Sequence, residues 1–509
     1  MSTGSHSAQS HNVAKKAKGG YTRQRRGCLT CRQRKKKCDQ ASPLCGHCLR
    51  LNLVCKREPP RELHKPDVWG EDDVEAGRAL TFPSASGIPT TRRSGKNIDE
   101  PPRPSICDPL DLFIPTVFGG KDPSTNRRSM MRYYTSTLAN MLSATWENNC
   151  FLSVILPMAF DCPLLLDVVS AMSSAHLAVH HPEFQVSSLQ HRGQVLANIS
   201  AAMQSNGLSD DMCLAVAMTM CSSETITDAT SSSWAHHLAG AAAVLQPKVA
   251  TEEALDPTRA ETGWLSSFEG KWLLRNFAYH DALMSVSLDR RPLLTGDYWA
   301  SADDTMADPY SAFASRIIFL ISEISILNAD WEEQWQSCDA LGDGSLLERA
   351  QGIAAQLRDW ECPQAQSSDA PLTVLSETYR SAAFIYLGRV IQKRCPADAD
   401  KVLPEGITPY VASICEAAVR VPQGSNEECS LLFPLFLAGG EAETGPHRHA
   451  IRDRMHSMNI WRKFRNVDAC IEVLDEVWAQ DPQRMQANQA ARLDWRNVVE
   501  QRGWQLALS

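Results

Sequence analysis

The sequence of 509 residues lacks the apolar segments that direct a chain into a membrane or anchor it there. Its first twenty residues, MSTGSHSAQSHNVAKKAKGG, contain no apolar run of the kind that a secretory signal requires. The most apolar stretch, FLSVILPMAFDCPLLLDVV, is interrupted by Asp161 and two prolines and is a poor membrane span. We therefore expect a chain that stays inside the cell, has no membrane partner and buries this stretch as core.

The sequence also lacks the common catalytic signatures. It contains no G-x-S-x-G and no P-loop lysine motif, so neither hydrolase nor nucleotide chemistry is indicated. His176 and His180 have the i, i+4 spacing of a helical metal pair, but no glutamate stands between them as in H-E-x-x-H. His280 and Asp281 are adjacent, and adjacent residues of a helix point in different directions. We interpret all four as structural and expect no catalytic residues and no enzyme.

Alternating β-branched runs are absent from the region after residue 125, where helical spacing dominates. Segments such as RSMMRYYTSTLANMLSATW and SETYRSAAFIYLGRVIQKR place apolar residues three and four apart. Breaks occur at Pro, Gly and Ser/Asp clusters, as expected for helix ends. No repeat with a fixed period of about 20 to 50 residues is present, which argues against a regular solenoid. The sequence predicts a large, irregular all-α domain over residues 126–509.

Charge is distributed unevenly along the chain. Through Lys65 the sequence contains 16 Lys and Arg against 3 Asp and Glu, whereas the remainder contains 35 against 56. The head is therefore basic and the body acidic, although the whole chain has a net charge of −8. This distribution predicts a polyanionic partner for the head alone.

The composition predicts four parts. Residues 1–27 are rich in Ser, Gly, Lys and Arg, so they form a disordered basic tail. A cysteine-rich module follows at 28–58, where the chain holds 6 of its 17 cysteines. Residues 59–125 mix Pro, Gly, Ser and charged residues and indicate a flexible linker. The helical domain occupies 126–509, and its scattered cysteines are expected to be buried small hydrophobic residues.

The six clustered cysteines have the spacing C-x2-C-x6-C-x6-C-x2-C-x6-C. The first three recur at a constant offset, which implies two equivalent metal sites; the six are Cys28, Cys31, Cys38, Cys45, Cys48 and Cys55. Disulfides are disfavoured inside the cell, so zinc is the better explanation. Two tetrahedral zinc ions need eight ligand contacts, so either two sulfurs bridge the ions or His47 contributes. Such a cluster can fold about thirty residues that lack a core.

The basic run RQRKKK lies between Cys31 and Cys38. Ligands at both ends would hold it as a short helix with its charges outward, since it contains nothing apolar to bury. A cationic helix fits the DNA major groove, where Lys and Arg donate to guanine O6 and N7, and neighbouring charges contact phosphates. The alternative interpretation is a solvated charge run or a nuclear import signal.

The stretch RRGCLTCRQRKKKCDQASPLCGHCLRLNLVC resembles, from end to end, the DNA-binding domain of the fungal binuclear zinc cluster (Zn2Cys6) transcription factors. The resemblance implies two short helices around two zinc ions, with Cys28 and Cys45 bridging the ions and Pro43 in the loop that joins the halves. It implies that Arg34 and Lys35 read a CGG-type triplet in double-stranded DNA. Arg32 and Lys37 would lie nearer the phosphates, and Lys36 belongs to the same DNA-binding run.

The helical region resembles the fungal-specific transcription factor regulatory domain more weakly, in segments such as WAHHLAGAAAVL and GKWLLRNFAYHDALMSVS. Many family members have a heptad coiled coil soon after the cluster, but here Pro59, Pro60 and Pro66 interrupt that position. Binding to a single triplet and homodimerisation through the helical domain therefore both remain open.

Two segments near the C-terminus have mixed interpretations. NVDACIEVLDEVWAQD has the composition of an acidic activation segment, but its apolar spacing favours an ordinary amphipathic helix. The basic stretch HRHAIRDRMHSMNIWRKFR is interpreted as a solvated helical face rather than a second DNA site.

These patterns together predict a nuclear, zinc-dependent, sequence-specific regulator of RNA polymerase II genes, acting with the transcription machinery, for instance on a metabolic gene cluster. The alternative is an enzyme or small-molecule receptor in the helical domain, merely tethered by the zinc module.

Overall fold

The structure is a computed structural model, and it describes residues 38, 123–205, 207–228, 230–252, 264–299, 307–336, 344–363, 370–486 and 494–509. The chain divides into two compact units, Met1–Glu100 and Pro101–Ser509. Every described residue except Cys38 belongs to the second unit. The predicted basic tail, and the predicted linker as far as residue 122, lie outside the described residues. The first described helix begins at Pro123, three residues before the expected start of the helical domain.

Helices make up the regular structure of the described residues, apart from one isolated bridge between Asp308 and Ala312. This confirms the predicted all-α domain. The first helices are α4 (Pro123–Tyr133), α5 (Ala139–Met141), α6 (Leu156–Asp161), α7 (Pro163–His180), α8 (Gln185–Ser205), α9 (Asp210–Thr227), α10 (Ser233–Glu252) and α11 (Phe268–Ser287). The later ones are α12 (Ser315–Gln336), α13 (Ser345–Asp359), α14 (Pro371–Arg394), α15 (Ala399–Val402), α16 (Thr408–Arg420), α17 (Leu432–Glu441), α18 (Gly445–Arg462), α19 (Arg465–Gln486) and α20 (Trp495–Gln501).

Short helical turns connect several of these helices. Two are π-helical, η1 (Tyr134–Leu138) and η2 (Phe151–Ile155), and four are 3-10 turns, η3 (Pro182–Phe184), η4 (Trp264–Ser266), η5 (Pro396–Asp398) and η6 (Glu427–Leu431). None of the helices that the structure describes combines the length and the apolar character needed to cross a bilayer.

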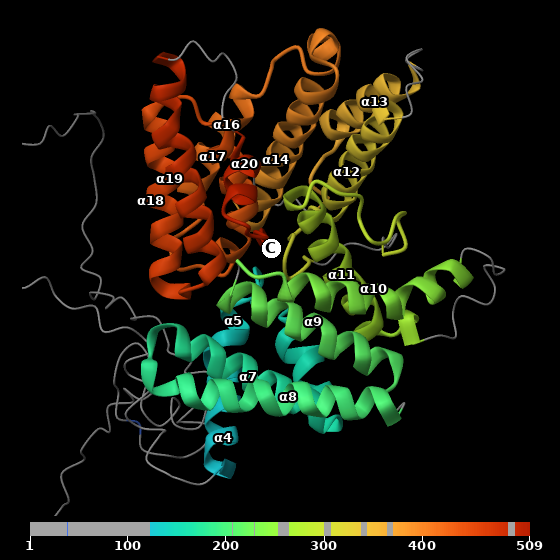
Figure 1. Cartoon of the computed structure of the whole chain (residues 1–509), viewed down its shortest axis with the longest axis vertical. Coiled ribbons are helices and arrows are strands. Elements are labelled where there is room, and N and C mark those ends of the chain that lie inside the picture. Colours follow the sequence, from blue (N-terminus) through green and yellow to red (C-terminus); the bar gives the residue numbers. More distant parts are fainter. Residues whose placement is uncertain are drawn as a thin grey trace, which may run out of the picture. The chain divides into compact units, whose positions relative to one another are not determined.

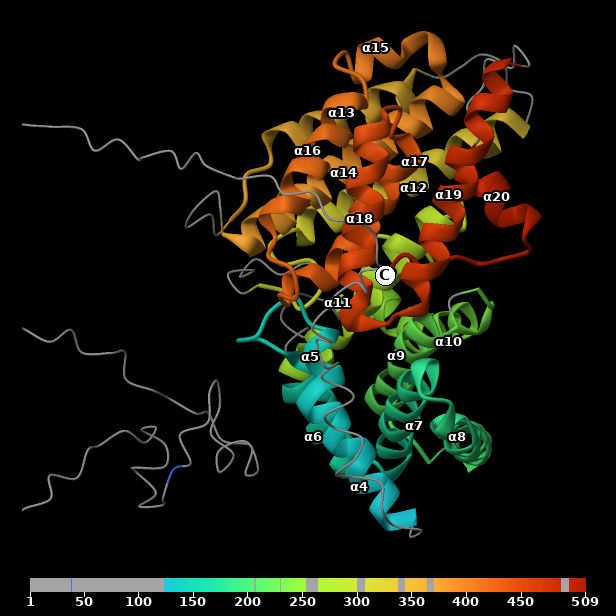
Figure 2. The same ribbon diagram turned by 90° about the vertical axis from the view of Figure 1, so that its left-hand side faces the viewer.

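The helices of this unit form two groups that meet at α11. Helices α4 to α10 lie together in the lower half of Figure 1, and α12 to α20 lie together in the upper half. Helix α11 packs against α9 and α10 on one side and against α12 on the other. Figure 2 shows the same division from the side. Residues from both groups can therefore meet around α11.

Most apolar residues of the stretch 151–169 are buried core, as its sequence predicts, whereas Phe160 is exposed. Phe151, Val154 and Ile155 are buried in η2, and Leu165 and Val168 are buried in α7. Prolines sit in the first turns of α6 and α7, where the missing N–H costs no helical hydrogen bond. The prolines that argue against a membrane span thus stand in the first turns of one short helix, α6, and one long helix, α7.

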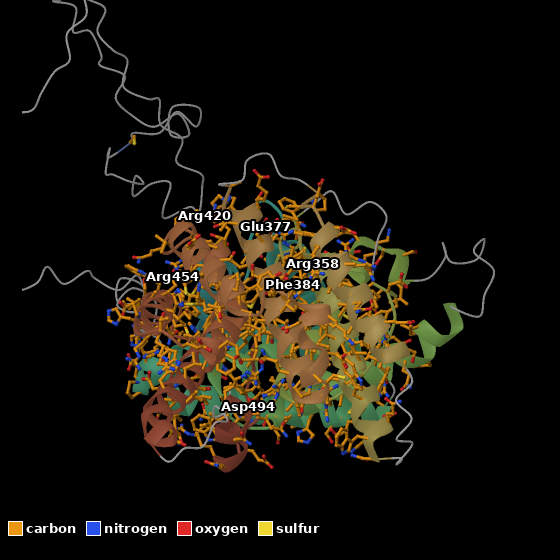
Figure 3. The ribbon with its side chains drawn as sticks, turned by 90° about the horizontal axis from the view of Figure 1, so that it is seen from above. Arg358, Glu377, Phe384, Arg420, Arg454 and Asp494 are labelled. Carbon is orange, nitrogen blue, oxygen red and sulfur yellow. The ribbon has the colours of Figure 1, made fainter. Side chains whose placement is uncertain are left out.

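Helix α14 is the most completely buried long helix of the upper group. It begins at Pro371 and ends before Pro396, so proline marks both ends. Its buried positions run around the whole helix because it contacts α12, α13, α16 and α17. On its flank, the guanidinium of Arg358 lies 5.9 Å from the ring centroid of Phe384, and Figure 3 labels both residues.

Helices α17, α19 and α20 approach closely where α17 carries two glycines. A Cβ placed on Gly439 would lie 2.6 Å from a methyl carbon of Leu474, and one on Gly440 would lie 2.8 Å from the Trp495 ring. The Trp478 ring N–H donates to the Gly439 carbonyl at 3.0 Å. Glycine suits both positions because an added Cβ would have to displace the Leu474 methyl groups or the Trp495 ring.

The segment after α20 runs into the space between the two helical groups, where the C-terminus is marked in Figures 1 and 2. Leu506, Ala507 and Leu508 are buried there. The ring N–H of Trp234 in α10 donates to the Gln505 carbonyl at 3.2 Å. This segment therefore connects the N-terminal helices to the C-terminal ones.

Candidate functional site

The residues predicted to bind zinc and DNA lie outside the described residues, except for Cys38, which is half-buried. The structure therefore does not bring the other five cysteines or the basic run together for inspection. The six cysteines themselves suit zinc, because thiolates are soft ligands that zinc prefers. Their C-x2-C-x6-C spacing occurs twice in the sequence. Among the residues that the structure does describe, no group of three or more His, Cys, Asp or Glu could hold a metal ion.

His176 is a packing residue, as the sequence analysis expected. Its Nδ1 lies 2.7 Å from the Tyr133 hydroxyl and its Nε2 lies 2.8 Å from the Arg462 carbonyl oxygen, so both ring nitrogens have partners. Burial lowers the pKa of His176 to about 4, which keeps the ring neutral. Neither nitrogen is available to share a metal with His180.

His280 and Asp281 are both buried in α11, but they contact different partners. The Asp281 carboxylate accepts hydrogen bonds from the backbone N–H groups of Leu293 and Leu294 at 2.7 and 3.1 Å, and it pairs with Arg290. It therefore holds the chain that leaves α11. His280 Nδ1 lies 2.6 Å from the Ser509 hydroxyl instead. The pair is not a base with its orienting carboxylate, and the structural interpretation is confirmed.

The acidic segment near the C-terminus forms part of α19. Ile471, Leu474 and Trp478 are buried on one face. The acids on the other face are paired, with Asp475 bonded to Arg452 and Glu476 bonded to Arg502. This confirms the amphipathic helix that the spacing favoured.

The basic stretch in α18 is not simply a solvated face, and that expectation is wrong for two of its arginines. Arg454 and Arg462 are buried. Arg454 pairs with Glu428, whereas Arg462 donates to the carbonyls of Met141 and Ser425 at 2.9 and 2.6 Å. These arginines hold loops together and cannot contact DNA. One signal was available in the sequence, because both lie at helical spacing from Ile451, Met455 and Met458, on the apolar stripe.

A cavity of about 250 Å³ between α7, α8 and α9 was missed by sequence reasoning. It contains the buried carboxylate of Glu224, which pairs with Arg192 at 3.2 Å. Burial raises the pKa of Glu224, and Arg192 opposes that shift. Among the described residues that line the cavity there is no histidine or cysteine, and the Thr227 hydroxyl donates to the Ser223 carbonyl. The described walls therefore offer no Cys–His or Ser–His pair.

Comparison with known families gives two matches. The model described as "Fungal specific transcription factor domain" matches residues 129–509, and the model described as "Fungal Zn(2)-Cys(6) binuclear cluster domain" matches residues 26–63. No solved structure is significantly similar to the chain.

Several curated proteins are similar to the chain. An uncharacterized transcriptional regulatory protein of Schizosaccharomyces pombe is 24% identical over 98% of each chain. Transcriptional activator protein UGA3 of Saccharomyces cerevisiae is 27% identical over 30% of each chain. The TY1 enhancer activator of the same yeast is 60% identical over 37 residues, which cover 7% of this chain and 5% of that protein.

Proposed function

The chain belongs to the fungal-specific transcription factor family and carries a Zn(2)-Cys(6) cluster domain, and on this premise we propose how it recognises DNA. It is a zinc-binding, DNA-binding transcription factor. We propose that it acts in the nucleus on RNA polymerase II genes, together with the transcription machinery, and that its helical domain regulates this activity and catalyses no reaction. The proposed division is a tail at 1–27, a DNA-binding domain at 28–58, a linker at 59–125 and a regulatory domain at 126–509.

The observation that carries the proposal is the duplicated C-x2-C-x6-C pattern around RQRKKK, which falls within the matched residues 26–63. Two zinc ions, when bound, supply the cross-links that fold a segment with no apolar core. The six cysteines would hold them as thiolates, with Cys28 and Cys45 each contacting both ions. Thiolate ligands make DNA binding dependent on metal and on pH.

The basic residues divide into two roles in this proposal. Arg34 and Lys35 donate to guanine edges of a CGG-type triplet in the major groove. Arg32, Lys36 and Lys37 contact phosphates and set the salt dependence of binding. Because prolines interrupt the segment after the cluster, a homodimer would use the helical domain, and a monomer would bind one triplet.

The test is a gel-shift titration of the full-length protein with duplexes that contain CGG or a scrambled triplet. Lys35→Ala should reduce the preference for CGG by roughly 5- to 150-fold, because a base contact is worth about 1–3 kcal/mol of discrimination. Lys56→Ala, outside the basic run, is the matched control and should leave the preference unchanged. An equal loss of affinity for both duplexes would make Lys35 a phosphate contact and contradict the assignment.

A further inference from the structure

A second cavity lies where the two helical groups meet, and it is enclosed by residues from many elements. Its volume is about 40 Å³. The walls come from the end of α5 and from α9, α11, η6, α17, α18 and α19, with the segment that follows α20. Met141, Ile226 and Leu432 make it largely apolar, and the described residues that line it include no Asp, Glu, Lys or Arg.

Four polar atoms buried in these walls have no hydrogen-bond partner. Two are the hydroxyl oxygens of Thr225 and Tyr310, and the other two lie on different helices and share a neighbour. One is Nε2 of His280 in α11, and the other is Oδ1 of Asn466 in α19. Both side chains are about 2% exposed. Ser509 holds each of these two side chains in place through its other polar atom. The Ser509 hydroxyl lies 2.6 Å from His280 Nδ1, and its main-chain carboxylate accepts from the Asn466 amide nitrogen at 3.1 Å. The two orphan atoms therefore belong to one rigid cluster beside one cavity.

Buried polar atoms without a partner are rare and costly, so their convergence on one cavity calls for an occupant. The amide oxygen of Asn466 requires a donor. Burial lowers the pKa of His280 to about 3, so its ring is neutral and offers a single donor or acceptor at Nε2. Hydroxyl groups of Thr225 and Tyr310 line the same cavity. The described walls hold no charged side chain, and the main-chain carboxylate of Ser509, which already accepts from Asn466, disfavours an anionic occupant.

The size of the cavity limits the occupant to a few non-hydrogen atoms. A volume of 40 Å³ accommodates about three waters at roughly 10–15 Å³ each. We infer that this cavity binds a small uncharged molecule that carries both a hydrogen-bond donor and an acceptor, of the size of acetamide or urea. Four such atoms bind no more tightly than roughly tens of micromolar. The site connects the two helical groups, so its occupancy stabilises their junction.

The experiment uses the full-length, zinc-containing protein without DNA, so its outcome is independent of the proposed DNA recognition. Saturation-transfer NMR compares acetamide, acetone and acetate, three probes of equal heavy-atom count. Acetamide should give a saturable signal. Acetone, which has no donor for Asn466, should bind at least roughly tenfold more weakly, and acetate should not bind.

Two variants of the protein locate the signal. Asn466→Leu keeps the side-chain shape and should weaken acetamide at least roughly tenfold, since it removes the acceptor in the wall. Asn497→Leu, at an exposed position in α20, is the control and should change nothing. The comparison of the three probes on the unaltered chain stands even where a variant fails to fold.

Three results would overturn the inference. Equal binding of acetone and acetamide would show that the unpaired polar atoms do not contribute to binding. Unchanged acetamide binding in Asn466→Leu would show that acetamide binds at another place on the protein. Transfer from water to the Asn466 side chain, with none from acetamide, would mean that the cavity holds water only.

Discussion

The guanidinium of Arg454 in α18 and the carboxylate of Glu428 in η6 form an ion pair of 3.1 Å, with the two side chains 8% and 0% exposed. The same carboxylate accepts a hydrogen bond from the Gly424 N–H at 3.0 Å, and Arg454 also donates to the Val421 carbonyl at 3.0 Å. The pair therefore ties the loop of residues 421–428 to α18. Figure 3 labels Arg454 on this part of the upper group.

Replacing Arg454 alone should destabilise the helical domain strongly. Arg454→Met leaves the Glu428 charge buried without a partner, and the expected loss in unfolding free energy is about 3–5 kcal/mol. Arg452→Met, two residues earlier, breaks a part-exposed pair with Asp475 and should cost at most about 1 kcal/mol. Urea unfolding followed by circular dichroism measures both. The double change Arg454→Met with Glu428→Gln should recover part of the loss, and no recovery would mean that the packing of Arg454, not the charge, is what matters.

The helical domain should lose stability as the pH falls below about 6.5. His176 is neutral in the folded chain, where burial lowers its pKa to about 4, but an unfolded histidine binds a proton near pH 6.5. Between these values the unfolded chain holds more protons, so acid favours unfolding, by about 2 kcal/mol from pH 7 to pH 5 for this residue.

The variant His176→Gln isolates this contribution. In this variant the free energy of unfolding, measured with urea, should fall by about 2 kcal/mol less between pH 7 and pH 5 than in the unaltered chain. The buried His280, whose pKa burial lowers to about 3, retains its own contribution, so some pH dependence persists. His449→Gln, at an exposed position of α18, serves as the control. An unchanged slope in His176→Gln would show that the pKa of this ring is the same in the folded and the unfolded chain.

Two glycine-to-alanine changes in helices should act in opposite directions. Gly439→Ala places a Cβ against Leu474 and should cost about 1–3 kcal/mol through overpacking. Gly193→Ala in α8 meets nothing within 4 Å and should stabilise by about 0.5–1 kcal/mol. Differential scanning calorimetry of the two variants provides the comparison. A rise in melting temperature for Gly439→Ala would mean that α19 moves aside at little cost.

Removing zinc should separate DNA binding from the integrity of the helical domain. No group of metal ligands is present in residues 123–509 as far as the structure describes them, and the six clustered cysteines lie elsewhere. EDTA should therefore abolish the CGG gel shift while the far-ultraviolet circular dichroism of the full chain changes little. Re-addition of zinc should restore binding. A cooperative loss of helix signal on chelation would instead place a metal in the regulatory domain.

Apolar spacing was enough to predict the helices, because the burial of an apolar stripe dominates where a helix forms. The stretch from Phe151 became short core helices, and α19 has the amphipathic face that its sequence indicates. The ion pair of Arg454 was not predictable in the same way, although its place on the apolar stripe signals burial. Its partner Glu428 belongs to a different element, and only the packing of η6 against α18 brings the two charges together.

The histidines illustrate the same limit. The absence of a glutamate between His176 and His180, and the adjacency of His280 to Asp281, correctly indicated that His176 and His280 are structural. However, the Arg462 carbonyl that contacts the His176 ring is 286 residues away along the chain. The Ser509 hydroxyl that contacts the His280 ring is 229 residues away. The cavity beside His280 is a product of such long-range packing, and no local pattern signals it. The zinc ligands are the opposite case, since a cluster confined to one short stretch is readable from spacing before any fold is known.

The hydrogen bond between Trp234 and the Gln505 carbonyl spans 271 residues. A ribosome that adds about 5–20 residues per second needs roughly 15 to 55 seconds to make that length of chain. During this interval the indole of α10 has left the ribosome, but the segment that covers it has not yet been synthesised. The nascent helix α10 thus lacks the C-terminal cover of its Trp234 ring for tens of seconds after it is made.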